Sequence, residues 1–142
     1  MKKKGQMKIS FGMIFSIILI IVFLVFAFSS IKGILNFQKD ATFKQFQDNF
    51  QKDLDKMHMG SSGSQQVSYG LPKDVEQICF VDDEFGNMVV RRDRDENINF
   101  EHLDIVNTLN GKKTLCFNNE EGKVKFLLEK KYGEPLVKVS EI

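Results

Sequence analysis

The sequence lacks the residue sets that most catalytic and metal-binding sites need. Only two of its 142 residues are histidine, and tryptophan is absent. His58 and His102 have no second histidine or cysteine at a ligand spacing, so we expect two surface or boundary residues and no zinc site. The serines of 61–64 have no accompanying His/Asp pattern that could activate a nucleophile. Because no paired acid and base is visible either, we expect no enzyme activity and no cofactor.

A basic surface is also lacking outside the N-terminus. The formal net charge is +1, but four of the 20 basic residues are Lys2, Lys3, Lys4 and Lys8. The other 16 basic residues stand against 19 acidic ones, so the remainder of the chain is slightly acidic. Nucleic-acid binding needs a basic footprint and is therefore not expected. The glycines of 60–63 precede no predicted helix, so they form no phosphate loop, and no small-molecule substrate is evident.

Residues 93–104 place oxygen-bearing side chains at the spacing of a calcium-binding EF-hand loop, but other features of that loop are missing. The oxygen-bearing residues are Asp93, Asp95, Asn97, Asn99, Glu101 and Asp104. The sixth position is Ile98, where the loop needs glycine, and the twelfth is an aspartate where a bidentate glutamate is usual. We therefore expect a solvated polar loop here, and a calcium site is the alternative.

Uncharged apolar residues are abundant near the N-terminus. The run 9–28, ISFGMIFSIILIIVFLVFAF, carries no charge. Twenty helical residues rise about 30 Å, which matches the hydrocarbon thickness of a bilayer. A helix that is apolar on all sides could instead lie in a protein core, but the rest of this short chain is too small to enclose it. We therefore predict a transmembrane helix at 9–30, with the lipid bilayer as its partner.

The lysines predict the orientation of this helix. Segment 1–8 carries four of them, and positively charged flanks stay on the cytoplasmic side. We therefore predict a single-pass protein of the cell membrane, with 1–8 as a basic cytoplasmic leader and the C-terminal domain outside the cytoplasm. A cleaved secretory signal peptide is the alternative, because Ala27-Phe28-Ser29 offers small residues at the spacing that signal peptidase recognises. The apolar run is longer than the usual signal-peptide core of about 7–15 residues, which favours a retained anchor.

A regular apolar stripe continues the helical pattern beyond the membrane segment. Apolar residues recur at steps of three or four at Phe43, Phe46, Phe50 and Leu54, while lysines and aspartates fill the other faces. We therefore predict one helix from about 9 to 58, whose part 31–58 is amphipathic. The stripe packs either on the chain's own sheet or as a seam against another copy of the helix. Because the run is shorter than roughly three heptads, packing within the chain is favoured.

Beyond the helix, the sequence predicts a small antiparallel β domain at 67–142, arranged as a meander, and the fold class is therefore α+β. The Gly/Ser-rich segment 59–66 is typical of a flexible linker. A short helix is predicted at 99–111, with Asn99 as its N-cap and Gly111 as its stop. Short alternating runs bounded by turn residues predict strands at 67–69, 75–81, 88–91, 114–117, 124–128 and 136–139.

Cys79 and Cys116 each lie in the middle of a predicted strand and each precede a phenylalanine. With the predicted topology they face an oxidising compartment, where paired thiols usually form a disulfide. Closing a loop of this length stabilises a domain by roughly 4 kcal/mol in the chain-entropy model. We therefore predict a disulfide, and two buried free cysteines are the alternative.

The residues Lys3-Lys4-Gly5-Gln6, followed closely by the apolar helix, resemble the class III signal peptide of archaeal type IV pilin-like proteins. The resemblance implies cleavage between Gly5 and Gln6 by a prepilin peptidase on the cytoplasmic face. It also implies that the apolar helix is retained and packs with further copies or other pilin-like subunits in a filament core. The sequence thus predicts a pilin-like structural or surface-assembly subunit. The alternative is a membrane-tethered binding or sensor module that does not polymerise.

Overall fold

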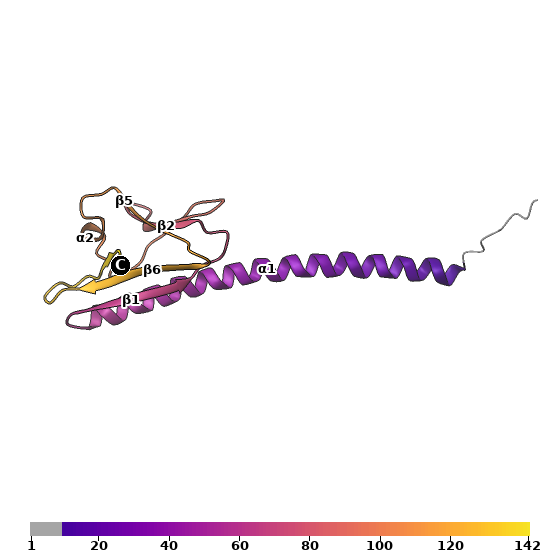
Figure 1. Ribbon diagram of the computed structural model, residues 1–142, viewed down its shortest axis with the longest axis horizontal. Coiled ribbons are helices and arrows are strands. Elements are labelled where there is room, and N and C mark those ends of the chain that lie inside the picture. Colours follow the sequence, from indigo (N-terminus) through magenta and orange to yellow (C-terminus); the bar gives the residue numbers. More distant parts are fainter. Residues whose placement is uncertain (1–9) are drawn as a thin grey trace, which may run out of the picture. The chain divides into compact units, whose positions relative to one another are not determined.

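The fold of residues 10–142, the part of the chain that the computed structural model describes, is α+β as the sequence predicts (Figure 1). The residues divide into two compact units, one reaching Gln38 and the other comprising Lys39–Ile142. The elements of the described chain are α1 (Phe11–Met59), β1 (Gly63–Gly70), β2 (Gln77–Asp83), β3 (Gly86–Arg91), β4 (Glu96–Ile98), α2 (Ile105–Leu109), β5 (Thr114–Asn118), β6 (Lys123–Lys130) and β7 (Lys138–Ser140).

The strands form two antiparallel sheets instead of the single meander that the sequence suggests. One sheet has the order β1-β6-β7, and the other has the order β4-β3-β2-β5. The chain crosses between the sheets at Leu71, whose N–H donates to the carbonyl of Gly122 next to β6. As a result β1 pairs with β6, far along the sequence, and places Val67 opposite Phe126. Figure 1 shows β1 and β6 running side by side.

Phe50 connects the helix to both sheets. Its side chain is 0% exposed and its ring lies 4.7–6.2 Å, centroid to centroid, from five other aromatic rings. Among these rings, Phe80 belongs to β2 and Phe126 to β6. Most of the pairs meet edge to face, the arrangement that aromatic quadrupoles favour. The four stripe residues of α1, Phe43, Phe46, Phe50 and Leu54, are all buried in this core. The stripe therefore packs within its own domain.

The prediction of a flexible linker at 59–66 is wrong for residues 63–66. Residues 63–66 belong to β1 and pair with Leu127–Lys130 of β6. Sheet pairing uses backbone N–H and C=O groups, so exposed serine and glutamine side chains do not prevent it. The end of α1 is held by Lys130, whose ammonium donates to the carbonyls of His58 and Gly60 at 2.6 and 2.5 Å. A cation at this position satisfies carbonyls that the helix leaves unpaired.

The predicted helix at 99–111 is also shorter than expected. Helix α2 begins after Asp104, whose carboxylate accepts from the backbone N–H of Asn107 at 3.1 Å. Asn99 cannot start the helix because the next residue, Phe100, is held by Asn87 through both its N–H and its C=O, each at 2.8 Å. Part of the polar segment 93–104 is strand β4, paired with β3.

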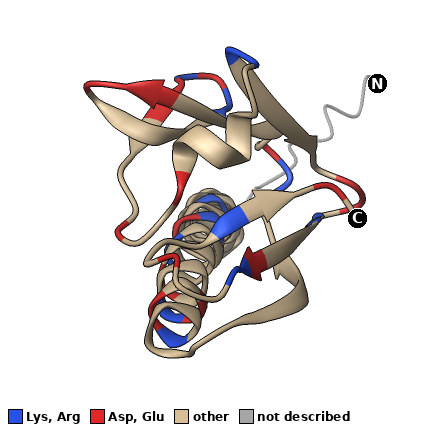
Figure 2. Cartoon of the chain, turned by 90° about the vertical axis from the view of Figure 1, so that its left-hand side faces the viewer, with Lys and Arg blue, Asp and Glu red and all other residues tan. Residues whose placement is uncertain are grey.

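Figure 2 shows acidic residues on α1 and on loops and strand ends of the domain. Carboxylates at exposed positions keep their hydration.

Candidate functional site

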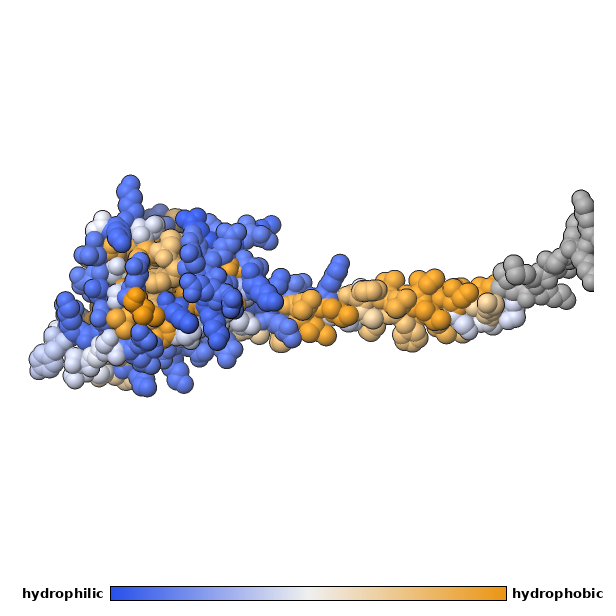
Figure 3. All heavy atoms as spheres, viewed as in Figure 1, coloured by the Kyte–Doolittle hydropathy of each residue, from blue (hydrophilic) through white to orange (hydrophobic). Residues whose placement is uncertain are grey.

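The first part of α1 exposes apolar side chains on every face. From Phe11 to Phe37 no residue is buried, and Phe23, Phe26 and Phe28 are each about two thirds exposed. This part appears as the orange segment of Figure 3. By length and composition the helix can cross a membrane, and a signal sequence near the N-terminus would pass the same test. A single apolar helix at this position indicates membrane anchoring.

Two serines satisfy backbone groups at the start of this helix. The hydroxyl oxygen of Ser10 accepts from the N–H of Met13 at 3.2 Å, as an N-cap does. The hydroxyl of Ser16 donates to the carbonyl of Gly12 at 2.8 Å, so no polar group of Ser16 is left unpaired in an apolar surrounding. The basic leader 1–8 and the predicted cleavage pair Gly5 and Gln6 lie outside the described residues.

The predicted disulfide is confirmed. Cys79 and Cys116 are bonded, and they lie directly opposite each other on the neighbouring strands β2 and β5. Cys79 is fully buried, so the bond is part of the core of the four-stranded sheet. It closes a loop that contains β3, β4 and α2. For a domain of this size, such a cross-link restricts the unfolded chain and so favours the folded state.

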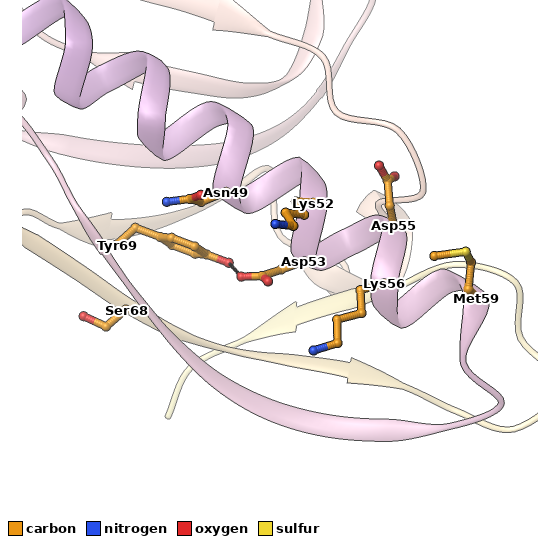
Figure 4. Close-up of a pocket in the computed structure, with 8 residues that line it drawn as sticks. All are labelled: Asn49, Lys52, Asp53, Asp55, Lys56, Met59, Ser68 and Tyr69. Carbon is orange, nitrogen blue, oxygen red and sulfur yellow. Dashed lines mark hydrogen bonds between the residues drawn. The ribbon is translucent and has the colours of Figure 1, made fainter.

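A groove lies between the second part of α1 and the strand β1, both in the unit Lys39–Ile142 (Figure 4). It encloses about 660 Å³ and opens to solvent, and a smaller hollow of about 160 Å³ extends it along the helix. Asn49, Ser68 and Tyr69 line both hollows, so the two form one continuous groove. The remaining residues along it are Thr42, Gln45, Phe46, Lys52, Asp53, Asp55, Lys56, Met59 and Gly70.

The Tyr69 hydroxyl donates to the carboxylate of Asp53 at 2.5 Å across this groove. Burial, together with the hydrogen bond to Asp53, raises the pKa of Tyr69 far above its ordinary value. Lys52 and Lys56, one turn apart on α1, form no ion pair within residues 10–142. Figure 4 shows Asp55 directed away from β1, so Lys52 and Lys56 place two ammonium groups beside one carboxylate in the groove, that of Asp53, which already accepts from Tyr69.

The two histidines, predicted as isolated boundary residues, lie together. The rings of His58 and His102 stack with centroids 3.8 Å apart and planes 11° apart. His102 Nδ1 lies 2.9 Å from a carboxylate oxygen of Asp55, which also accepts from Gln51 at 2.8 Å. These hydrogen bonds, the one from His102 first, lower the pKa of Asp55. His58 Nδ1 lies 2.5 Å from the carbonyl oxygen of Pro135.

The histidine pair joins the end of α1 to two loops. Throughout the described part of the chain, no three His, Cys, Asp or Glu side chains are arranged to hold a metal ion, and this includes the polar segment 93–104. His102 adopts a left-handed backbone conformation, φ 64°, which non-glycine residues rarely adopt. Contacts between residues 44 positions apart leave no periodic signal, and the sequence therefore gave no indication of this pair.

Comparison of the chain with protein families, with characterised proteins and with solved structures found no match. The function is therefore inferred from the apolar helix, the disulfide-bonded domain and the groove.

Proposed function

We propose that the chain is a pilin-like structural subunit, anchored in a membrane by its apolar helix and carrying the unit Lys39–Ile142 outside the cytoplasm. The observation that carries this proposal is the double use of α1. Its first part is exposed and apolar on all faces, and its second part supplies the centre of the domain core. A subunit built in this way keeps its domain folded whether lipid or neighbouring helices surround its first part.

The orientation is supported by two independent features. The lysines of 1–8 precede the apolar helix, and such residues stay on the cytoplasmic side. The disulfide Cys79–Cys116 lies in the domain that follows the helix, and structural disulfides persist in oxidising compartments. Both features favour an N-terminus inside and a domain outside.

Assembly requires the apolar helix to exchange lipid for neighbouring helices. Helix association in a bilayer depends on packing and hydrogen bonding, because lipid chains are as apolar as leucine. Leucine, isoleucine, valine and phenylalanine at 17–28 suit either surrounding. The lysines Lys2, Lys3 and Lys4, however, are attracted to the anionic cytoplasmic leaflet by about 1 kcal/mol each. A subunit that leaves the bilayer must therefore lose them, and processing after Gly5 removes them.

A membrane-tethered binding module is the second candidate, and the groove is the observation that favours it. A permanent tether keeps its basic leader, and its groove binds a partner without assembly. The two functions therefore differ in the state of the N-terminus.

The mature N-terminus decides between them, and intact mass of protein recovered from native membranes measures it. We expect a chain that begins at Gln6, and Gly5→Leu should block processing and leave the protein in the membrane. Gly33→Leu is the matched control, because a Cβ at Gly33 meets no atom within 4 Å. This variant should be processed normally.

A native mass that retains residues 2–5 would remove the pilin-like function and leave the tethered module. A chain that begins after the apolar helix would instead show a secreted protein.

A further inference from the structure

We propose that the groove between α1 and β1 receives the acidic turn of a second copy of this chain, the turn that joins β2 to β3. The acidic turn comprises the last two residues of β2, Asp82 and Asp83, and the two turn residues Glu84 and Phe85. This contact rests on the proposed function, since it supplies an attachment between domains of neighbouring subunits.

The acidic turn is an exposed and unpartnered feature. Its three consecutive carboxylates form no ion pair and no hydrogen bond with any side chain described here. Phe85 follows them and is 68% exposed, although aromatic side chains gain free energy when they are buried. Aromatic residues are enriched at the cores of protein interfaces, so Phe85 offers an apolar anchor beside the three carboxylates.

The backbone around the acidic turn is fixed before any contact forms. Gly86 lies so close to β4 that a Cβ there would be 2.6 Å from the carbonyl oxygen of Ile98. Asn87 is held by two hydrogen bonds to Phe100. Because the turn is positioned in advance, less conformational entropy is lost when it binds.

The groove offers complementary groups. Lys52 and Lys56 have no anionic partner within residues 10–142, and Met59 is 82% exposed at one end. The two ammonium groups outnumber the one carboxylate directed into the groove, that of Asp53, so they match the carboxylates of the acidic turn. The thioether of Met59 packs well against an aromatic ring. Asn49 and Ser68 add neutral hydrogen-bonding groups between the charges.

Strand β1 adds backbone groups to the same groove. It is the edge strand of its sheet and pairs only with β6. Among the described residues, no backbone outside that pair bonds the stretch 64–69. An unpaired edge accepts an incoming segment through N–H and C=O groups, and on the β5 side the end of β2 beyond Val81 is unpaired.

The acidic turn and the groove belong to different elements, so each copy carries both halves of the contact. A contact of this kind is head-to-tail, and its repetition links copies into an open chain or a ring. A symmetric pairing of two β1 edges would instead stop at a dimer. The geometry therefore supports extended assembly.

A zero-length cross-link tests the contact in the full chain. Equal amounts of ¹⁴N- and ¹⁵N-labelled protein in detergent are mixed and treated with a water-soluble carbodiimide. The reagent activates a carboxylate, a lysine amine attacks it, and an amide forms as the reagent leaves as a urea with the elements of water. We expect mixed-isotope cross-links from Lys52 or Lys56 to the acidic turn. Cross-links confined to one isotope, or absent from these sites, would overturn the proposal.

Charge reversal provides the second test. Lys52→Glu with Lys56→Glu, and separately Asp83→Lys with Glu84→Lys, should each lower the cross-linked fraction about tenfold, because reacting groups are removed and like charges then face each other. A one-to-one mixture of the two double variants should restore it, since each then offers a charge-complementary partner. Failure of the mixture to restore cross-linking, with both variants retaining the disulfide and the melting transition, would overturn the contact.

Lys123→Glu with Lys125→Glu makes the same change in net charge on β6, outside the groove. This control should keep the cross-linked fraction unchanged. An equal loss of cross-links in the control would show that only overall charge attracts the copies, and this would overturn the proposal.

Processing at Gln6 is measured separately. Processing without cross-links keeps the pilin-like function and rejects this contact, while cross-links on an unprocessed chain keep the contact and reject that function.

Discussion

At the scale of single residues, Tyr69 combines two environments. Its ring packs edge to face on Phe46 and Phe50, and its hydroxyl reaches the groove, where it donates to Asp53. Ionisation would bring a phenolate against the Asp53 carboxylate in a buried position. Burial first, and this hydrogen bond second, therefore raise the pKa of Tyr69.

The raised pKa of Tyr69 predicts a loss of stability in alkali. The protonated form is favoured in the folded state, so its contribution is complete below the unfolded pKa of about 10 and declines as pH rises above it. We expect the melting midpoint of the full chain to fall above about pH 10, and Tyr69→Phe to remove much of that fall. Calorimetry of both proteins between neutral and alkaline pH measures this. An identical decline in the variant would show that other groups cause it.

The stacked histidines show where residue-scale inference from sequence ends. His58 lies in the last turn of α1, and His102 lies in a loop that adopts its form only when Asn87 holds Phe100 and Asp104 caps α2. Their contact depends on tertiary structure, and no local pattern encodes it. The oxygen-bearing residues of 93–104, by contrast, form a pattern within one short segment. Part of that segment is nevertheless a strand, because it pairs with the edge of β3.

At the scale of elements, α1 owes its position to the stripe that ends in Leu54. The stripe faces both sheets at once, because Phe80 and Phe126 contact Phe50 from different sheets. Helix and sheets therefore form one cooperative core. Removing the Phe50 ring at the centre of this core therefore weakens the packing of the helix and of both sheets.

Phe50→Ala should destabilise the domain by about 3–5 kcal/mol, the usual effect of deleting a fully buried phenylalanine. Denaturant unfolding of the full chain, followed by circular dichroism, measures the change. Phe85→Ala also deletes a phenylalanine ring, but at an exposed position, and should change the free energy of unfolding by less than about 0.5 kcal/mol. Equal effects of the two substitutions would contradict the role of the stripe in the core.

The elements differ in how well their sequences predict them. The bounds of α1 follow from an uninterrupted apolar run and a stripe at helical spacing, and both ends fall close to those predicted. The strand around Cys116 follows from alternation, and the strand around Cys79 follows from a short apolar run, 78–81, that turn residues end. The first half of β1 does not, because Gly63–Gln66 joins the sheet through backbone pairing that any sequence without proline can make.

At the scale of the whole molecule, the pairing of strands is set by two crossings between the sheets, the first at Leu71 and the second between β5 and β6. Consecutive strands usually pair, which is why the sequence suggests a single meander. Here the chain changes sheets between β1 and β2, and β6 returns to complete the first sheet. The groove depends on this exchange, since it leaves β1 at a sheet edge beside α1. No local feature of the sequence predicts the groove.

The topology of the whole chain predicts which lysines an impermeant reagent can reach. With the domain outside, an amine-reactive reagent that cannot cross membranes should label the exposed Lys112 and Lys113 on intact cells. Lys2, Lys3 and Lys4, where they are retained, should be labelled only after lysis. Peptide mass spectrometry identifies the labelled sites. Labelling of Lys112 and Lys113 only in lysed cells would reverse the proposed orientation.

The bond between Cys79 and Cys116 also closes a covalent ring of backbone, and the stretch 93–95 within this ring is exposed. An extracellular peptidase that cuts inside this ring adds one water but releases nothing, because the disulfide still holds both pieces. A domain on a cell surface would thus survive such a nick in one piece. Fragments would separate only in a reducing environment.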